Sequence, residues 1–414
     1  MKEKQLTTTI LHADRRHSVE HGAIHKPIHV STEYAYDDAR ELAAVFQGKP
    51  GYTYARQGTP TTAALENKMT LLEQGKGTVT FATGMAALSA IFLTLLRKGD
   101  HLISSSFIFG NTNSLLGTLA QFGVDITFVD PSDVEGVRAA IRPETRMVFV
   151  ETIANPGTQI ADLENIGLLC SDHNLVYVVD NTLTSPFLLK GKDVHASLVM
   201  NSLSKYICGH GNALGGSVTN TGLYDWSGFS NIYDDYKKGS PDSWGLTQIK
   251  KKGLRDMGGT LSADAASRIS AGAETLALRM TQSCSNALAL ATFLQSHPGI
   301  ASVRYPGLAD HPQHELATTL FNGRYGALLG VELIDGIDCF DFLNSLDVVI
   351  LATHLGDSRT LSLPVAHTIY YEMGAQRRAE MGIGDNLLRI SVGIEDEQDL
   401  LDDFAQALDR CMKR

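Results

Sequence analysis

Long apolar runs alternate with helix-length intervals through the middle of the chain. The runs are GTVTFATG, HLISSSF, DITFVD, RMVFVETIANP, LVYVVDNT and ASLVMNSLS, which together span residues 77–204. They are rich in Val, Ile and Leu and almost uninterrupted by polar residues, as strands buried on both faces are. Because helix-sized stretches separate them, the pattern predicts an α/β fold with a large, mostly parallel sheet covered by helices.

The flanking regions have different patterns. Residues 1–60 show no long helical or strand period, and so long an irregular segment is expected to serve a function or to lie across a partner. The next stretch, TPTTAALENKMTLLEQG, predicts a helix that starts near Thr59 or Thr61 and ends before Gly75. From about residue 259 a long helical pattern is followed by strands in YGALLGVELI and NLLRISVGI and by the amphipathic helix DEQDLLDDFAQALDRCMK.

These patterns predict three parts: an N-terminal arm (1–60), a parallel-sheet domain (61–258) and a smaller C-terminal α/β domain (259–414). Residues 223–256 fit neither helix nor strand well and predict an excursion near the junction of the two domains. The two tryptophans of that region, Trp226 and Trp244, are expected to serve packing.

Composition narrows the class of protein. The chain has 414 residues, 43% of them hydrophobic and 20% charged, with a net charge of −11. An acidic balance argues against a nucleic-acid or anionic-membrane partner, and no run approaches the roughly 20 apolar residues that span a bilayer. Five widely spaced cysteines and histidines without ligand spacing predict neither disulfides nor a metal site. We expect a soluble, cytoplasmic protein.

Two residues at strand ends indicate a cofactor. Ligands of open α/β sheets bind beyond the C-terminal ends of the strands, where Asp180 ends LVYVVD and Lys205 follows ASLVMNSLS. Taken singly, the aspartate is an ordinary helix N-cap and the lysine an ordinary surface charge. Together they provide a carboxylate for a protonated ring nitrogen and an amine for a Schiff base, which are the requirements of pyridoxal 5′-phosphate (PLP).

Candidate phosphate ligands accompany this pair. The backbone N–H groups of Gly84 and Met85 open a predicted helix, and a helix start favours anions. Ser202 and Ser204 add hydroxyl donors, and Arg56 adds a charge-assisted hydrogen bond.

The glycines after the lysine do not form a dinucleotide-binding loop. Gly209, Gly211 and Gly215 are spaced GxGxxxG, and the required βαβ unit with a later acidic residue is missing. We interpret them as a tight backbone turn behind Lys205.

Seven motifs resemble one family in their order along nearly the whole chain. They are YTYARQGTPT, ATGMAAL, ETIANP, VVDNT, SLSKYICGHGNALGG, YPGL…HPQH and LLRISVGIE. The chain resembles the Cys/Met-metabolism PLP-dependent enzymes, the transsulfuration group that includes cystathionine γ-synthase, cystathionine lyases, methionine γ-lyase and O-acylhomoserine sulfhydrylases. The resemblance implies a fold-type-I PLP enzyme, with PLP bound by residues 61–258, and a homotetramer built from two dimers.

The resemblance also implies roles for single residues. Lys205 is the catalytic Schiff-base lysine, Asp180 the partner of the ring nitrogen, and Arg389 the ligand of the substrate carboxylate. The resemblance implies a phosphate cradle made of Gly84, Met85, Ser202 and Ser204. It implies that the phosphate of the neighbouring subunit's cofactor is reached by Tyr54 and Arg56. It also implies that Asn155 lies near the cofactor's ring oxygen and that Phe109 stacks on the ring.

Departures from the family concern the substrate. Phe109 replaces a tyrosine, and so lacks a hydroxyl that protonates a leaving group. His354 and Arg359 stand where serine and, in cystathionine-handling members, glutamate are common; Arg359 would repel the distal ammonium of cystathionine. Asn201 stands where histidine is common, and this position carries no conclusion here. The departures predict γ-elimination or γ-replacement on a homoserine-type amino acid with an oxygen-linked leaving group.

O-acylhomoserines fit this prediction, and a succinyl tail would suit Arg359. Canavanine has an oxygen-linked leaving group, which agrees with Phe109, but Arg359 would repel its cationic tail. The alternatives are β-elimination by a C–S lyase acting on cystathionine- or cysteine-like substrates and, in a different class, a non-catalytic PLP-fold binding protein. The presence of Lys205, Asp180 and Arg389 together argues against a non-catalytic binding protein.

Overall fold

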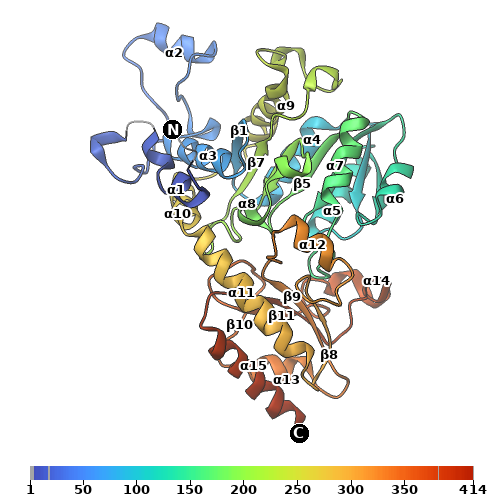
Figure 1. The fold of residues 1–414 in the computed structure, drawn as a ribbon. Coiled ribbons are helices and arrows are strands. Elements are labelled where there is room, and N and C mark those ends of the chain that lie inside the picture. The colour runs from blue at the N-terminus through green and yellow to red at the C-terminus, as the bar shows by residue number, and fades with distance from the viewer. Residues whose placement is uncertain (1–3, 17–18, 381, 414) are drawn as a thin grey trace.

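The computed structural model describes residues 4–16, 19–380 and 382–413, and is built around two β-sheets (Figure 1). The larger sheet has seven strands in the order β1-β7-β6-β5-β4-β2-β3. All are parallel except β7, which runs antiparallel to both neighbours. The strands are β1 (Gly77–Phe81), β2 (His101–Ser105), β3 (Asp125–Val129), β4 (Thr145–Glu151), β5 (Val176–Asp180), β6 (Leu198–Asn201) and β7 (Gly216–Asn220). The predicted mostly parallel sheet is confirmed.

Helices cover both faces of this sheet, because both faces of each central strand are apolar. On β4, for example, Val148 and Val150 belong to one hydrophobic cluster, and Met147 and Phe149 belong to another on the opposite face. The helices of this part are α3 (Pro60–Leu72), α4 (Gly84–Leu95), α5 (Gly110–Gln121), α6 (Val134–Ala139), α7 (Leu163–Asp172) and α8 (Ser185–Leu188).

Helix α3 begins as its sequence predicts. Thr59 is the N-cap, and its hydroxyl accepts a hydrogen bond from the Thr62 N–H at 3.1 Å. Pro60 follows as the first helical residue, a position where its missing N–H costs nothing. The helix ends at Leu72, so that Glu73 becomes its C-cap.

The second sheet lies below the first in Figure 1 and has five strands in the order β10-β11-β12-β9-β8. They are β8 (Ile300–Arg304), β9 (Leu328–Leu333), β10 (Ile350–Leu351), β11 (Leu361–Pro364) and β12 (Leu387–Ser391). The long helical pattern that precedes them forms two helices rather than one, interrupted at Thr275. The helices are α10 (Ala263–Glu274), α11 (Leu276–Gln295), α12 (His314–Leu320), α13 (Cys339–Asn344), α14 (Gly374–Glu380) and the predicted closing helix α15 (Glu397–Met412).

In residues 4–16 and 19–59 the helices are all short, α1 (Leu6–Leu11) and α2 (Ala39–Phe46) among them. Figure 1 shows α2 and its flanking loops, in blue, standing away from the sheets, and α2 has no buried residue. Several large apolar side chains of this segment are exposed, including Ile24, Val30 and Phe46 at 70% or more. The domain boundaries near residues 60 and 258 stay predictions.

Residues 223–256 form a series of short helical turns. These are three 3₁₀ turns, at Trp226–Gly228, Asp234–Tyr236 and Pro241–Ser243, then α9 (Trp244–Gln248) and a π-helix at Ile249–Asp256. Trp226 is fully buried and packs edge-on against Tyr224 and Phe229. Across the described ranges, no helix is long and apolar enough to cross a membrane.

Candidate active site

A cavity of about 520 Å³ opens at the C-terminal ends of β4, β5 and β6, where the sequence predicts the site. Most of the candidate residues line it: Gly84, Met85, Phe109, Asn155, Asp180, Ser202, Ser204, Lys205 and Arg389. Four candidates are not among its lining residues: Tyr54, Arg56, His354 and Arg359. The cavity therefore joins the ends of the parallel strands to Arg389 of the second sheet.

Lys205 lies in the turn that follows β6. Its carbonyl accepts the Gly209 N–H at 2.8 Å, and Gly209 and Gly211 have φ angles of +71° and +59°. Glycine adopts these left-handed angles at little cost, so the predicted tight turn is confirmed. Burial, with a smaller contribution from the nearby Arg389 guanidinium, lowers the pKa of Lys205 to about 8. The amine is therefore closer to its neutral, reactive form at neutral pH than an exposed lysine is.

Asp180 is the last residue of β5, and its Oδ1 accepts the Thr182 N–H at 2.9 Å. Burial raises the pKa of Asp180 to about 6, and hydrogen bonds from Thr182 oppose this shift. A protonated ring nitrogen beside it would restore the carboxylate by direct attraction.

A second acid, Glu151, lines the same cavity and has no predicted role. It ends β4 directly beside Asp180 in the strand register, and its Oε1 accepts the backbone N–H of Phe109 at 2.7 Å. Burial and the Asp180 charge raise the pKa of Glu151 well above its usual range. The signal for Glu151 was available, because it ends a buried apolar strand just as Asp180 does.

Two of the residues predicted to bind the phosphate, Gly84 and Met85, lie at the start of α4. Thr83 is the N-cap and accepts the Ala86 N–H at 3.0 Å. The N–H groups of Gly84 and Met85 have no acceptor within the helix. A Cβ on Gly84 would lie 2.9 Å from the Ser202 Cβ, so only glycine leaves this space open. The Ser204 hydroxyl is engaged with the backbone of Gly215, whose N–H it accepts at 2.9 Å.

Arg389 on β12 faces the cavity from the second sheet. Its Nη2 donates to the carbonyls of Thr353 and His354 at 2.8 and 3.0 Å. Burial lowers its pKa to about 10, so it remains a cation at neutral pH. The Arg389 Nε and the Asn155 Oδ1 are buried without a hydrogen-bond partner in the described part of the chain. Such atoms fit a site that holds a ligand with polar groups.

His354 contacts the lysine although it does not line the cavity. Its Nδ1 lies 3.3 Å from the Lys205 Nζ. Burial, and then the Lys205 charge, lower the pKa of His354 to about 4. The imidazole is therefore neutral at neutral pH, with Nδ1 able to accept a hydrogen bond from the lysine.

Arg359 and the Tyr54–Arg56 pair lie outside the cavity. The Arg359 side chain is 62% exposed and donates to Asp357 Oδ1 at 2.9 Å. Arg56 donates to the Arg255 carbonyl at 2.6 Å, and its guanidinium lies 5.4 Å from the centroid of the Tyr54 ring. The predicted roles of these three residues stay predictions.

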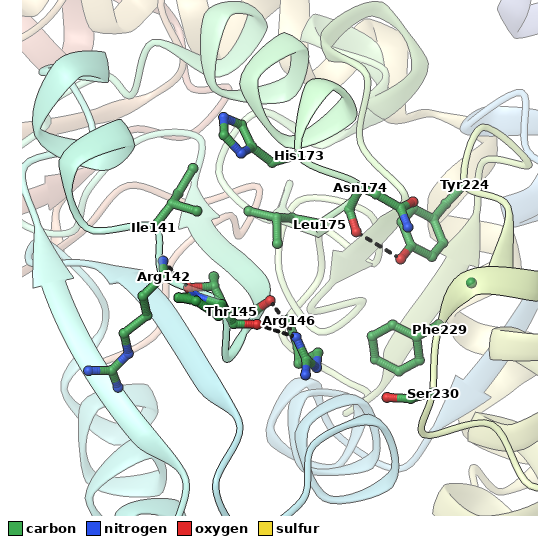
Figure 2. Close-up of a pocket in the computed structure, with 12 residues that line it drawn as sticks. Ile141, Arg142, Thr145, Arg146, His173, Asn174, Leu175, Tyr224, Phe229 and Ser230 are labelled. Atoms are coloured by element: carbon green, nitrogen blue, oxygen red, sulfur yellow. Dashed lines mark hydrogen bonds between the residues drawn. The ribbon is translucent and has the colours of Figure 1, made fainter.

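Another cavity, of about 590 Å³, lies at the opposite edge of the large sheet and contains no candidate residue (Figure 2). It is formed where β4 and β5 begin. Its two arginines have acidic partners nearby: Arg142 Nη2 lies 2.7 Å from Asp125, and Arg146 Nε lies 3.4 Å from Asp100. Figure 2 shows Arg146 directed toward Phe229. Of these two cavities, it is the one at Lys205 that combines an amine, an acid and a helix start.

The lysine, the strand-end acid and the helix start fit PLP, and they place the protein in the class of PLP-dependent enzymes. Comparison with known proteins specifies the family. Residues 7–409 match the family model described as Cys/Met metabolism PLP-dependent enzyme, and the chain belongs to this family. The resemblance of its motifs is thereby confirmed.

Similar proteins include both lyases and transferring enzymes. The L-methionine γ-lyase of Fusobacterium nucleatum subsp. polymorphum is 35% identical over 99% of both chains. The homocysteine synthase of Schizosaccharomyces pombe is 31% identical over 99% of both. The crystal structure of a putative O-acetylhomoserine (thiol)-lyase from Campylobacter jejuni has a TM-score of 0.91 and 30% identity over 98% of this chain and 100% of that one; it carries a pyridoxyl-lysine monophosphate.

These relatives establish a PLP-dependent enzyme of the γ-lyase and γ-synthase type. Its chemistry is γ-elimination or γ-replacement on an amino acid, with a fold shared by cystathionine γ-lyase of Lactobacillus plantarum (TM-score 0.88, 30% identity, 99% and 100% coverage). The predicted fold class and cofactor are confirmed.

Proposed function

We propose that the enzyme acts on homoserine-type amino acids whose γ-substituent leaves through oxygen, such as O-acylhomoserines. The observation that carries the proposal is Phe109, which lines the cavity with a ring that has no hydroxyl. An oxygen-linked acyl group departs as a carboxylate, which needs no proton, whereas a thiolate departs more readily with an acid beside it. A site without that acid therefore favours the oxygen-linked group.

The residues of the cavity divide the work as follows. When bound, PLP supplies an electron sink for the carbanion formed at the substrate's α-carbon. Lys205 would take the proton from this carbon and then a proton from the β-carbon, so that the electron pair of that C–H bond forms the Cβ–Cγ double bond as the γ-substituent leaves. Asp180 keeps the ring nitrogen protonated, and Arg389 orients the substrate carboxylate by a bidentate contact. Neutral His354 accepts a hydrogen bond from Lys205 and lies close to the path of these protons.

A substrate panel tests the leaving group. The purified PLP-loaded enzyme is assayed for 2-oxobutanoate with O-acetylhomoserine, O-succinylhomoserine, cystathionine, methionine and canavanine, with and without an added thiol. We expect the highest kcat/KM for an O-acylhomoserine. Fastest turnover of a thioether would refute the proposal, and pyruvate from cystathionine would instead indicate β-elimination. The added thiol distinguishes replacement from elimination.

A single variant isolates the ring-stacking position. Phe109→Tyr restores a hydroxyl while keeping the ring, so kcat for methionine should rise relative to kcat for O-acetylhomoserine, by about tenfold or more for one general acid. An Arg359→Gln control tests whether an anionic tail uses that guanidinium. Loss of O-succinylhomoserine activity alone would support this role, and unchanged activity would exclude it.

We further propose that the enzyme works as a homotetramer in the cytoplasm, with Tyr54 and Arg56 completing a neighbour's phosphate site. The exposed apolar side chains of the N-terminal segment support a surface covered by a second copy. The cysteines within the described ranges are free thiols, as expected in a reducing compartment. Mixing inactive Arg56→Ala and Lys205→Ala chains should restore up to a quarter of the wild-type activity if sites are shared between two subunits. No recovery in mixtures shown to exchange subunits would contradict the shared site.

A further inference from the structure

A buried carboxylate behind the cavity has no part in the roles described above. Glu73 is the C-cap of α3 and is fully buried. Its Oε1 accepts hydrogen bonds from Asn181 Nδ2 at 3.1 Å and from Asn201 Nδ2 at 2.7 Å, and the Gly191 N–H lies 3.5 Å from Oε2. Every one of these partners is a donor, so the arrangement suits an ionised carboxylate.

These two asparagines lie where the backbone ladder between β5 and β6 stops. The last paired residues are Asp180 and Met200, followed by one more bond from the Asn181 N–H to the Met200 carbonyl at 2.8 Å. Beyond this point side chains join the two strands. On the cavity side, Thr182 Oγ1 accepts the Ser202 N–H at 2.8 Å, and on the other side Glu73 bridges the asparagines.

A contribution to fold stability does not explain why Glu73 is buried between the two asparagines. Burial raises the pKa of Glu73 to about 7, although the hydrogen bonds from Asn201 and Asn181 oppose the shift. Replacing a buried charged network by apolar residues of similar volume is often neutral or stabilising. Asn201 Oδ1 is also buried with no partner in the described ranges. Turning its amide over would place this oxygen against Glu73, so the carboxylate dictates the orientation of Asn201.

We propose that Glu73 is a positioning residue for the cofactor site. Through Asn181 and Asn201 it fixes the ends of β5 and β6, and thereby holds Asp180 and Ser202 where the cofactor meets them. Asn181 directly follows Asp180, and Asn201 directly precedes Ser202, so a shift of either asparagine displaces a cavity residue. This role concerns cofactor binding and does not depend on which substrate the enzyme prefers.

Two substitutions of the carboxylate separate its positioning role from its charge. Glu73→Gln retains an oxygen that accepts both asparagine N–H groups, whereas Glu73→Met has a similar length and no such acceptor. The PLP-free proteins are titrated with PLP, and the Kd is read from the absorbance of the lysine-bound cofactor. We expect Glu73→Met to raise the Kd at least tenfold and Glu73→Gln to raise it less than threefold.

A matched control excludes a general loss of stability. Asp403 is also buried, and it accepts the N–H groups of Asp347, Val348 and Val349 in the C-terminal part. Asp403→Leu should lower the urea midpoint of unfolding and leave the PLP Kd within twofold of wild type.

Two results would overturn the proposal. One is an unchanged Kd in Glu73→Met; the other is an equal increase in Glu73→Met and Asp403→Leu, because affinity would then merely follow stability. If Glu73→Met fails to fold, Asn201→Leu removes one partner only and should raise the Kd by a smaller factor of about three to ten. An unchanged Kd in that variant would also refute the role. Because no substrate enters these measurements, their outcome is independent of the proposed leaving group.

Discussion

Replacing Lys205 by methionine should stabilise the PLP-free protein, although it removes the amine that we propose binds the cofactor. Burial, with a contribution from Arg389, lowers the pKa of Lys205 from 10.5 to about 8. A lowered amine pKa means that the fold disfavours the charged form, so below pH 8 the native state holds an ammonium group at a cost. Methionine has nearly the same length and carries no charge.

The size of the effect follows from the pKa values. Lowering the Lys205 pKa from 10.5 to about 8 disfavours the charged form in the folded protein by roughly 3 kcal/mol. Loss of the hydrogen bond to His354 reduces the gain by about 1 kcal/mol. Between pH 8 and 10.5 the unfolded chain binds more protons than the native state, so wild-type stability rises with pH over this window. The advantage of the variant should therefore fall from about 2 kcal/mol at pH 7 to near zero, on the order of 0–1 kcal/mol, at pH 9.5.

Urea unfolding of the PLP-free wild type and Lys205→Met at both pH values measures this difference. Lys76, whose side chain is 62% exposed beside Asp242, provides the control. Lys76→Met should change the free energy of unfolding by less than about 0.5 kcal/mol at either pH. A Lys205→Met variant that is less stable than wild type at pH 7, or whose advantage grows with pH, would refute the reasoning.

Three further predictions follow from individual contacts. Lys68 is fully buried, and its Nζ lies 3.0 Å from Glu274. Lys68→Met should therefore lower the free energy of unfolding, measured by urea titration, by about 3 kcal/mol. A decrease below about 1 kcal/mol would show that the ion pair is not essential. Gly84→Ala should weaken PLP binding at least tenfold, because the added Cβ would press on Ser202. Absorbance titration measures the affinity, and the far-UV circular dichroism should be unchanged. Unaltered affinity would show that the space at Gly84 is not needed for PLP. Burial lowers the pKa of His101, so the fold favours the neutral imidazole and loses stability as pH falls below about 6.5. In thermal melts, the decrease in Tm from pH 7 to pH 5 should be smaller for His101→Gln than for wild type. Equal decreases in Tm would contradict this prediction.

Most of the large sheet was predictable because its strands carry continuous apolar runs, but β7 was not. This strand is paired on both sides, between β1 and β6, yet Ser217, Thr219 and Asn220 are all buried polar residues. Two of them bond to neighbouring elements: the Thr219 hydroxyl lies 2.8 Å from the Thr78 hydroxyl, and Asn220 Nδ2 donates to the Asp242 carbonyl at 2.7 Å. A strand whose buried side chains bond to neighbouring elements has no apolar period, and its place in the sheet depends on contacts distant in sequence.

The same distinction applies to the site. Lys205 and Asp180 were predictable because each lies at the end of a buried strand, where ligands of parallel sheets bind. Glu73 was not, since a glutamate at a helix end is usually solvated and its asparagine partners lie more than 100 residues away in the sequence. Arg359 shows the opposite case, because sequence position suggested a substrate contact whereas the structure places its side chain mostly in solvent.

The two halves of residue 354 have separate tasks, and this separation affects how the enzyme can evolve. Its carbonyl oxygen helps to anchor the Arg389 guanidinium, whereas its imidazole faces the Lys205 amine. Every amino acid has a backbone carbonyl, so this contact does not depend on the side chain at position 354. The side chain can therefore be exchanged, and the surroundings of the lysine changed, while the contact that holds the Arg389 guanidinium stays in place. Mutational libraries aimed at new reactivity have at position 354 a site where change near the amine leaves the hydrogen bond to the Arg389 guanidinium intact.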